Sequence, residues 1–264
     1  MKITTWNINS IRKRLDIVHR VLNEIQPDVL CLQEIKVITE LFPYEFFNKL
    51  GYVTQYIKGQ SGYNGVAILG KFGTIKDVQE MQLSSESRHL SVLLSNGIEL
   101  HNFYIPAGGD VPDSVVNEKF KYKLQFFDDI TAWFLNNRTA KDKIILVGDL
   151  NVAPLENDVW SHKQLLKVVS HTPVEIEKIN SLYKSIDFLD AIRKFIPPEQ
   201  KLYSWWSYRN RDWRKSDRGR RLDHIWVTQP LFPYVIEGHI AREVRGYLNP
   251  SDHCPVTIQL SKRQ

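Results

Sequence analysis

The chain has 264 residues with a formal net charge of +5, and 42% of its residues are hydrophobic and 25% charged. These values are typical of a soluble globular protein and exclude a disordered or low-complexity chain. No apolar run approaches the length of a membrane span, and the N-terminal MKITTWNINS lacks the apolar stretch of a signal peptide. We therefore expect a cytoplasmic protein that does not enter a membrane.

The chain shows no internal boundary between domains. No repeat, low-complexity tract or Pro/Gly/Ser-rich linker interrupts it, so we expect one domain over residues 1–264. Its two cysteines, Cys31 and Cys254, are too few for a disulfide framework and fit no zinc motif. A chain of this length can bury a full core without either kind of cross-link.

The first predicted elements form a strand–helix–strand unit. A short strand over Lys2–Trp6 comes first, and Ser10 is placed to cap a helix whose apolar residues recur at helical spacing over Leu15–Ile25. Pro27 ends that helix. The apolar run that follows predicts a buried strand over Asp28–Leu32, after which the chain turns polar.

Strands dominate the rest of the chain. Leu90–Leu94 and Ile98–Ile105 flank the turn Asn96-Gly97, which is a strong hairpin signal. Apolar residues from Phe120 to Phe134 mark one face of a long helix, and Thr172 begins a second helix with a proline at its first position and a capping box. Further strands are expected at Tyr52–Ile57, Gly65–Leu69, Lys143–Val147, Leu222–Val227 and Val256–Leu260.

Many strands with few helices between them predict an α/β (α+β) fold of two mixed sheets packed face to face with helices outside. Polar residues follow several of the predicted strands, and strand ends at one edge of a sheet converge in space. Carboxylates, amides and one histidine without cysteines suit a hard cation, Mg²⁺ or Mn²⁺. The residues placed in this way are Asn7, Glu34, Asp149, Asn151, Asp223, Asp252 and His253.

Each of these residues also has a structural explanation. Asp149 and Asn151 could serve a turn, and His253 could be a structural histidine. Tyr104, at the end of an alternating strand, would ordinarily serve packing. Glu34 is harder to explain in this way, because a carboxylate emerging from a buried strand needs a partner. Their joint placement favours a functional site.

A basic stretch follows three quarters of the way along the chain. Tyr208–Arg221 carries seven basic residues against two acidic ones, and four large aromatic residues lie within or beside it: Trp205, Trp206, Tyr208 and Trp213. Arginine and lysine among aromatic side chains suit phosphate contacts combined with stacking on bases or sugars. The alternative is a solvated charged loop.

The motifs together resemble the exonuclease III family, within the wider DNase I-like metal-dependent phosphodiesterases. They run in family order over essentially the whole chain, and the ordered set is specific although each motif alone is weak. The fold that the resemblance implies is a four-layered α/β sandwich. The matching segments are TTWNINSIR (4–12), LQEIK (32–36), NGVAIL (64–69), YIP (104–106), GDLNVAP (148–154), WWSYR (205–209), GRRLDHIWV (219–227) and SDHCPV (251–256).

The resemblance also implies roles at the metal site. Glu34 is similar to the family's principal metal carboxylate, with Asn7 and Asp252 as direct or water-mediated ligands. Asp149 resembles the residue that orients or deprotonates the attacking water, and Asn151 the one that binds the phosphate or the nucleophile. The metal-site residues implied are Asn7, Glu34, Asp149, Asn151, Asp252 and His253.

Further roles concern the substrate. Asp223 and His253 resemble the family's Asp–His pair beside the scissile phosphate, and Tyr104 a residue that contacts the phosphate or assists the leaving oxygen. The DNA contacts implied are Asn9, Arg12, Arg209, Arg220 and Arg221, and the pocket for a flipped-out baseless sugar is implied to be lined by Trp205, Trp206 and Leu222.

Two positions depart from the family pattern. Ala107 stands where many members carry an asparagine that helps bind phosphate, so that a backbone amide or Arg12 would have to substitute. Asp217 replaces the asparagine usual before Gly219, which weakens any DNA contact assigned there.

By resemblance, the protein is a monomeric, Mg²⁺-dependent DNA repair enzyme for which Mn²⁺ can substitute. It is expected to hydrolyse double-stranded DNA 5′ to abasic sites and to act as a 3′→5′ exonuclease and on blocked 3′ ends. The alternatives are a superfamily relative that hydrolyses phosphoinositides, sphingomyelin or RNA tails, and a DNA-binding module that has lost catalysis. The basic aromatic stretch argues against the first, and the intact polar set against the second.

Overall fold

The computed structural model describes residues 1–79, 86–210 and 212–261. Two six-stranded mixed sheets form its centre. In spatial order, the first contains β13 (Val235–Ile240), β14 (Val256–Leu260), β1 (Lys2–Asn7), β2 (Val29–Gln33), β4 (Val66–Gly70) and β3 (Thr54–Lys58). The second contains β5 (Ile75–Gln79), β6 (His89–Leu94), β7 (Glu99–Tyr104), β8 (Ile144–Asp149), β12 (Asp223–Val227) and β9 (Leu189–Asp190).

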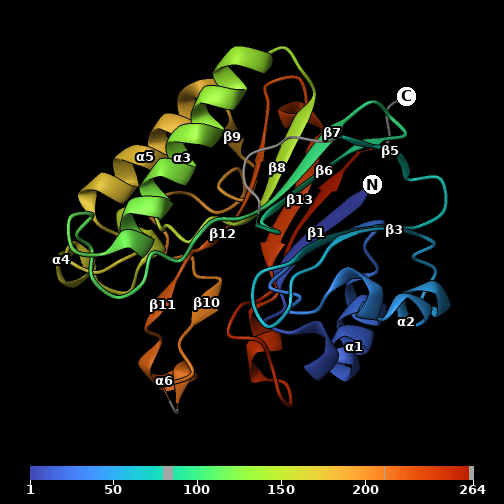
Figure 1. Cartoon of the computed structure of the whole chain (residues 1–264), viewed down its shortest axis with the longest axis horizontal. Helices are drawn as coiled ribbons and strands as arrows, with labels where there is room; N and C mark the ends of the chain where they lie inside the picture. The colour runs from blue at the N-terminus through green and yellow to red at the C-terminus, as the bar shows by residue number, and fades with distance from the viewer. Residues whose placement is uncertain (80–85, 211, 262–264) are drawn as a thin grey trace.

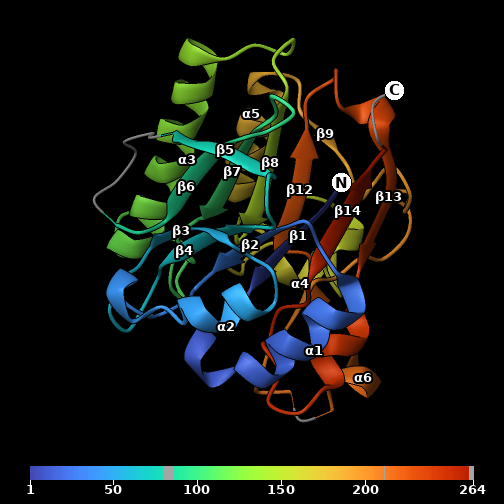
Figure 2. The ribbon, with the colours of Figure 1, turned by 90° about the vertical axis from the view of Figure 1, so that its right-hand side faces the viewer.

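Helices cover the outer face of each sheet. Figure 1 shows α3 (Glu118–Asn137) and α5 (Pro173–Ser185) side by side on one flank, against the second sheet. Figure 2 shows α1 (Leu15–Ile25) and α2 (Tyr44–Lys49) together against the first sheet. The shorter helices are η1 (Ile11–Lys13), η2 (Thr39–Leu41), η3 (Glu156–Asp158), α4 (His162–Leu165), α6 (Trp213–Ser216), η4 (Phe232–Tyr234) and η5 (Arg242–Gly246). The predicted four-layered sandwich is therefore confirmed.

Apolar side chains fill the space between the two sheets. Cys31 and Ile68 of the first sheet share one buried cluster with Val92, Val147 and Ile225 of the second. Two central strands, VLCLQ of β2 and IILVGD of β8, are buried along their whole length, because each sheet is covered on both faces. The continuous apolar runs in the sequence have this cause.

Of the two helix caps predicted from the sequence, the one at Thr172 is confirmed and the one at Ser10 is wrong. Thr172 caps α5 as expected, because its hydroxyl accepts from the Glu175 N–H and the Glu175 side chain completes the capping box. Ser10 does not cap α1. It has a positive φ of 87° and precedes η1, and α1 begins only at Leu15 after Arg14.

The predicted strands at 90–94, 143–147 and 256–260 are present to within two residues, whereas β5, β9 and β13 were not predicted. β13 has exposed and half-buried positions because it lies at an edge. A separate two-stranded hairpin, β10 (Trp205–Trp206) with β11 (Gly219–Arg220), extends from one end of the sheets and is tipped by α6 (Figure 1). No helix in the described part of the chain is long and apolar enough to cross a membrane.

Candidate active site

The strand pairing brings the predicted site residues together at one end of the central strands of both sheets. β7 and β8 run parallel, so that their last residues, Tyr104 and Asp149, are neighbours. β12 runs antiparallel to β8, which places its first residue, Asp223, beside Asp149. Asn7 ends β1, and Glu34 follows the parallel strand β2 directly. Five polar residues far apart in sequence therefore meet where the strands end.

One glycine is required for this arrangement. Gly148 has a φ of 137°, and a Cβ at this position would lie 1.9 Å from the carbonyl oxygen of Phe103. Any larger residue would push β8 away from β7. Gly148 thus allows Asp149 to lie close to Tyr104.

Three side chains form a possible cation site. Glu34, Asp149 and His253 each offer a ligand atom, and these atoms lie within 4.8 Å of one another. Asn7 connects the two carboxylates, because its Nδ2 donates to Glu34 Oε1 at 2.8 Å and to Asp149 Oδ2 at 2.9 Å. The two carboxylates supply the oxygen ligands that a hard divalent cation such as Mg²⁺ or Mn²⁺ prefers.

The two carboxylates have opposite pKa shifts. Burial disfavours the charged form of Glu34, but Lys36, with Nζ 2.8 Å from Glu34 Oε2, and Asn7 outweigh it and lower the pKa of Glu34. Burial raises the pKa of Asp149 to about 7, although the positive charge of His253 opposes the shift. Glu34 therefore favours its charged form, and Asp149 holds a proton more readily than a free carboxyl group does.

His253 is fixed by a buried carboxylate. Its Nδ1 donates to Asp223 Oδ2 at 2.8 Å, and its Nε2 lies 3.7 Å from Asp149 Oδ2. Burial disfavours the imidazolium, but Asp223 and Asp149 outweigh that effect and raise the pKa of His253 to about 10. The imidazole is thus held as a cation facing Asp149.

Ser204 completes this pair, and the sequence analysis missed it. Its hydroxyl donates to Asp223 Oδ2 at 2.6 Å and accepts from the backbone N–H groups of Leu222 and Asp223, each at 3.0 Å. The bond to Asp223 spans 19 residues, so no local pattern could have revealed it. Ser204 fixes the carboxylate that in turn fixes His253.

Two site residues have strained backbones. Glu34 and Asn151 have φ angles of 49° and 53°, in the left-handed region that non-glycine residues avoid. The side chain of Asn151 donates to the carbonyl of Ile105 at 2.8 Å, and its backbone N–H donates to Asp149 Oδ1 at 3.0 Å.

Burial and the negative charges of Glu34 and Asp149 raise the pKa of Tyr104, which keeps its proton.

Asp252 lies beside the cation site but is not one of the three clustered residues. Its two oxygens accept from Trp205 Nε1 and Asn9 Nδ2, each at 3.0 Å. Asn9 Oδ1 in turn accepts from Lys36 Nζ at 2.6 Å. These bonds hold Asp252 in position beside the cluster.

A cleft of about 750 Å³ opens above this cluster. One part of it, which we call the aromatic slot, is walled by Trp160, Trp205, Arg220 and Leu222. Arg209 and Arg218 also line the cleft. Arg12 is exposed on η1 and is not among the lining residues, and Arg211, a member of the basic stretch, lies outside the described residues.

Two predicted substrate contacts are wrong. Arg221 is 2% exposed, and its guanidinium is enclosed by Asp158 and Asp190, with Nε 2.8 Å from Asp158 Oδ1. Trp206 is fully buried and packs with Tyr203 and Cys254. Both side chains point into the protein and serve packing, so neither can contact DNA as expected.

The two departures from the family pattern have structural explanations. Ala107 and Gly109 line the cleft, so the position of the missing asparagine does border the site. Asp217 accepts from Trp206 Nε1 at 3.1 Å and from Arg242 Nη2 at 2.8 Å. Asp217 therefore anchors the tip of the β10–β11 hairpin instead of facing the cleft.

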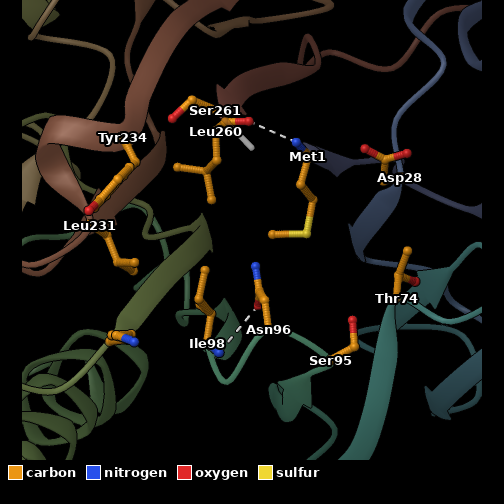
Figure 3. A pocket seen from close by; sticks show the side chains of 11 residues that line it. Met1, Asp28, Thr74, Ser95, Asn96, Ile98, Leu231, Tyr234, Leu260 and Ser261 are labelled. Atoms are coloured by element: carbon orange, nitrogen blue, oxygen red, sulfur yellow. Dashed lines mark hydrogen bonds between the residues drawn. The ribbon is translucent and has the colours of Figure 1, made fainter. Parts of the chain in front are cut away.

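A second cleft, of about 560 Å³, lies at the opposite ends of the central strands, and Figure 3 shows the side chains that line it. Met1 and Lys143, which precede β1 and β8, line it together with Leu231 and Leu260. It is thus remote from the strand ends that carry Asn7 and Asp149, and we assign the chemistry to the first cleft.

Known proteins share this sequence and geometry. The profile of the Endonuclease/Exonuclease/phosphatase family matches residues 4–253. The exodeoxyribonuclease III of Haemophilus influenzae is 31% identical over 269 residues, which cover 97% of this chain and 98% of that protein. The chain belongs to the exonuclease III family. It is therefore a metal-dependent phosphodiesterase of the exodeoxyribonuclease III and AP endonuclease type, a class of DNA repair nucleases.

Solved structures of exonuclease III family members agree with this assignment. An AP endonuclease from Archaeoglobus fulgidus superposes with a TM-score of 0.91 at 31% identity, over 99% of this chain and 100% of that one. The 3′ phosphatase NExo from Neisseria, bound to a product DNA hairpin, superposes with a TM-score of 0.89 at 30% identity and the same coverage.

Proposed function

We propose that this exonuclease III family member hydrolyses DNA on the 5′ side of abasic sites and removes nucleotides or blocking groups from 3′ ends of duplex DNA. The observation that carries the proposal is the cluster of Glu34, Asp149 and His253 at the floor of a cleft whose wall is the aromatic slot. The cluster supplies the chemistry of phosphodiester hydrolysis. The slot offers apolar surface to a sugar that has lost its base and is therefore easily extruded from the helix.

In the proposed reaction, Asp149 accepts the proton of the attacking water, for which its raised pKa is suited. The His253 cation stabilises the negative charge that develops on the phosphate oxygens. Asn151 donates its two side-chain N–H groups to the Ile105 carbonyl and to Asp149 Oδ2, so its Oδ1 is the atom that would accept a hydrogen bond from the attacking water. Tyr104, which stays protonated, donates a hydrogen bond to the phosphate or to the departing 3′ oxygen. Asp223 and Ser204 keep the imidazole in place throughout.

Glu34 and Asp149, with His253 beside them, would hold the divalent cation, which we propose to be Mg²⁺ with Mn²⁺ as a substitute. When bound, it supplies Lewis acidity that neutralises charge on the phosphate. The donor set fits such an ion, because oxygen ligands predominate and Asn7 fixes both carboxylates.

Double-stranded DNA is the proposed partner. Arg209 and Arg218 line the cleft and are placed to contact backbone phosphates, whereas Arg220 lies in the aromatic slot. Asn9 lies at the border of the cleft through its bond to Asp252. Arg12 is exposed and free to contact the backbone further from the cleft. We propose that the protein acts as a monomer, since one chain supplies every residue of the site.

The proposal is tested with a duplex that contains one tetrahydrofuran abasic-site analogue. Mg²⁺-dependent incision on its 5′ side, abolished by EDTA, is the expected result. Tight binding without incision would instead indicate a DNA-binding module. If the protein neither binds nor incises this duplex, the phosphoester substrates of other superfamily members become the ones to test.

A further inference from the structure

Arg220 occupies the aromatic slot as a fixed cation. It pairs with Trp205 across the β10–β11 hairpin, and its guanidinium carbon lies 5.3 Å from the centre of the Trp205 ring. Its Nη1 donates to the carbonyl of Val169 at 2.9 Å and to Ser170 Oγ at 2.7 Å. Arg220 also lines the cleft that contains Asp149.

The contacts of Arg220 extend into a rigid part of the protein. The backbone N–H of Ser170 donates to both carboxylate oxygens of Glu175 at 2.9 Å, and Glu175 forms a fully buried ion pair with Lys123. The stacking surface of Trp205 is likewise held through the bond from its Nε1 to Asp252. The guanidinium is therefore preorganised before any ligand enters.

Part of the hydrogen-bonding capacity of Arg220 is unused. Among the described residues, its Nε is buried and has no hydrogen-bond partner. Burial lowers the pKa of Arg220 against the attraction of the Glu175 carboxylate, and within the described residues no carboxylate lies close enough to form an ion pair with it. A partly desolvated guanidinium without a paired anion is costly unless a ligand supplies the negative charge.

We propose that Arg220 makes the aromatic slot selective for an anionic group attached to the scissile phosphate, namely the carboxylate of a 3′-phosphoglycolate end, over the neutral baseless sugar. The inference rests on the proposed function, because it names the preferred substrate of the same site. A baseless sugar requires only apolar surface there. A carboxylate on the far side of the phosphate would form a charge-assisted hydrogen bond with Nη2 of Arg220, because Nη1 already donates to Val169 and Ser170 and Nε is buried.

The reaction on such an end is the same hydrolysis. Water adds its oxygen to the phosphorus, and the bond between phosphorus and the 3′ oxygen breaks. The 3′ oxygen takes up a proton. The products are a DNA 3′ hydroxyl and free 2-phosphoglycolate, so that no co-reactant other than water is consumed.

The test compares two substrates and two variants. The substrates are a nicked duplex with a 3′-phosphoglycolate end and an intact duplex with one tetrahydrofuran site. Arg220→Gln should lower kcat/KM for the first substrate at least about tenfold more than for the second, since a hydrogen bond to a charged group contributes 1.5–3 kcal/mol. Arg218→Gln is the matched control. Arg218 lines the same cleft, stacked 4.8 Å from the ring centre of Trp160, and its loss should affect both substrates equally.

A second measurement does not require a variant. Free 2-phosphoglycolate should inhibit wild-type cleavage of the tetrahydrofuran duplex about tenfold more strongly than 2-hydroxyethyl phosphate, which has the same phosphate and a neutral tail. Equal inhibition, or equal losses of both activities in Arg220→Gln, would overturn the proposal and leave Arg220 as a general backbone contact. Failure of the wild-type protein to cleave either DNA in Mg²⁺ would refute the proposed function instead.

Discussion

Lys123 and Glu175 form an ion pair of 2.5 Å in which neither side chain has any solvent exposure. Lys123 Nζ also donates to the carbonyl oxygen of Asn151 at 2.8 Å, so the pair supports the strained turn that presents Asn151 to the cleft. Removing one member of a buried pair leaves an uncompensated charge.

Lys123→Met should therefore lower the free energy of unfolding by about 3–5 kcal/mol. Urea denaturation of the wild type and the variant measures the change. Lys178→Met is the matched control, because its partner Asp128 is half exposed, and it should cost less than about 1 kcal/mol. Equal effects of the two substitutions would contradict the structural role given to Lys123.

Asp149→Asn keeps the shape of the side chain but removes the proton acceptor. We expect a folded protein that binds abasic duplex with near wild-type affinity and cleaves it about 10²–10⁴-fold more slowly. Single-turnover cleavage and fluorescence anisotropy measure the two quantities. A variant with less than a tenfold loss of rate would transfer the role of base to another group.

Trp205 and Trp206 are adjacent but have different surroundings, and their alanine variants should separate accordingly. Trp206→Ala empties a fully buried site and should cost about 3–5 kcal/mol of stability. Trp205→Ala removes part of the slot wall and should lower incision at an abasic site more than it lowers the thermal midpoint. Thermal denaturation and incision assays on both variants measure these effects. A lower thermal midpoint for Trp205→Ala than for Trp206→Ala would contradict the prediction.

Arg209 and Arg221 provide a similar contrast for DNA binding. Arg209→Ala should reduce the slope of log affinity against log salt concentration by about 1, as expected for the loss of one phosphate contact. Arg221→Ala should leave the slope unchanged and instead destabilise the fold, because Asp158 and Asp190 lose their buried partner. A reduced slope in a folded Arg221→Ala protein would restore the original expectation of a DNA contact.

Glu99 gives an acid-dependent contribution to stability. Burial disfavours its charge, but His101 and Arg138 outweigh burial and lower its pKa from 4.5 to about 2. Because the folded-state pKa is the lower one, the stabilisation is complete above about pH 4.5 and is lost as the pH falls toward 2. The difference in unfolding free energy between the wild type and Glu99→Gln should thus be on the order of 2 kcal/mol at neutral pH and decrease in acid. A difference that does not vary between pH 6 and about pH 2.5 would contradict the assignment.

The sequence predicted the strands and the meeting of polar residues at their ends, because both follow from the order of apolar and polar residues along the chain. Continuous apolar runs indicated β2 and β8. The polar residues Glu34 and Asp149 stood out because each follows such an apolar run. Partners distant in sequence left no such signal. Arg221 stands in a run of basic residues, and only the fold brings Asp158 to it across 63 positions.

The same limitation explains the remaining errors. An aromatic residue beside a basic loop has the same sequence context whether its ring lies in the cleft, as for Trp205, or in the core, as for Trp206. The cap predicted at Ser10 failed because the backbone there takes a positive φ and η1 precedes the α-helix. Each outcome was decided by tertiary packing, which overrides local preference.

The hydrogen bonds from His253 to Asp223 and from Asn7 to Asp149 each cross from one sheet to the other. The spacing of the reacting groups therefore depends on how closely the two sheets pack over their whole shared interior. Close-packed interiors transmit small changes in volume, so we expect a methyl group lost near Ile68 or Val92 to shift the spacing of the site residues, and with it turnover, while each of those residues keeps its identity. Evolution can in this way adjust the rate of the enzyme through its apolar interior without changing its chemical groups.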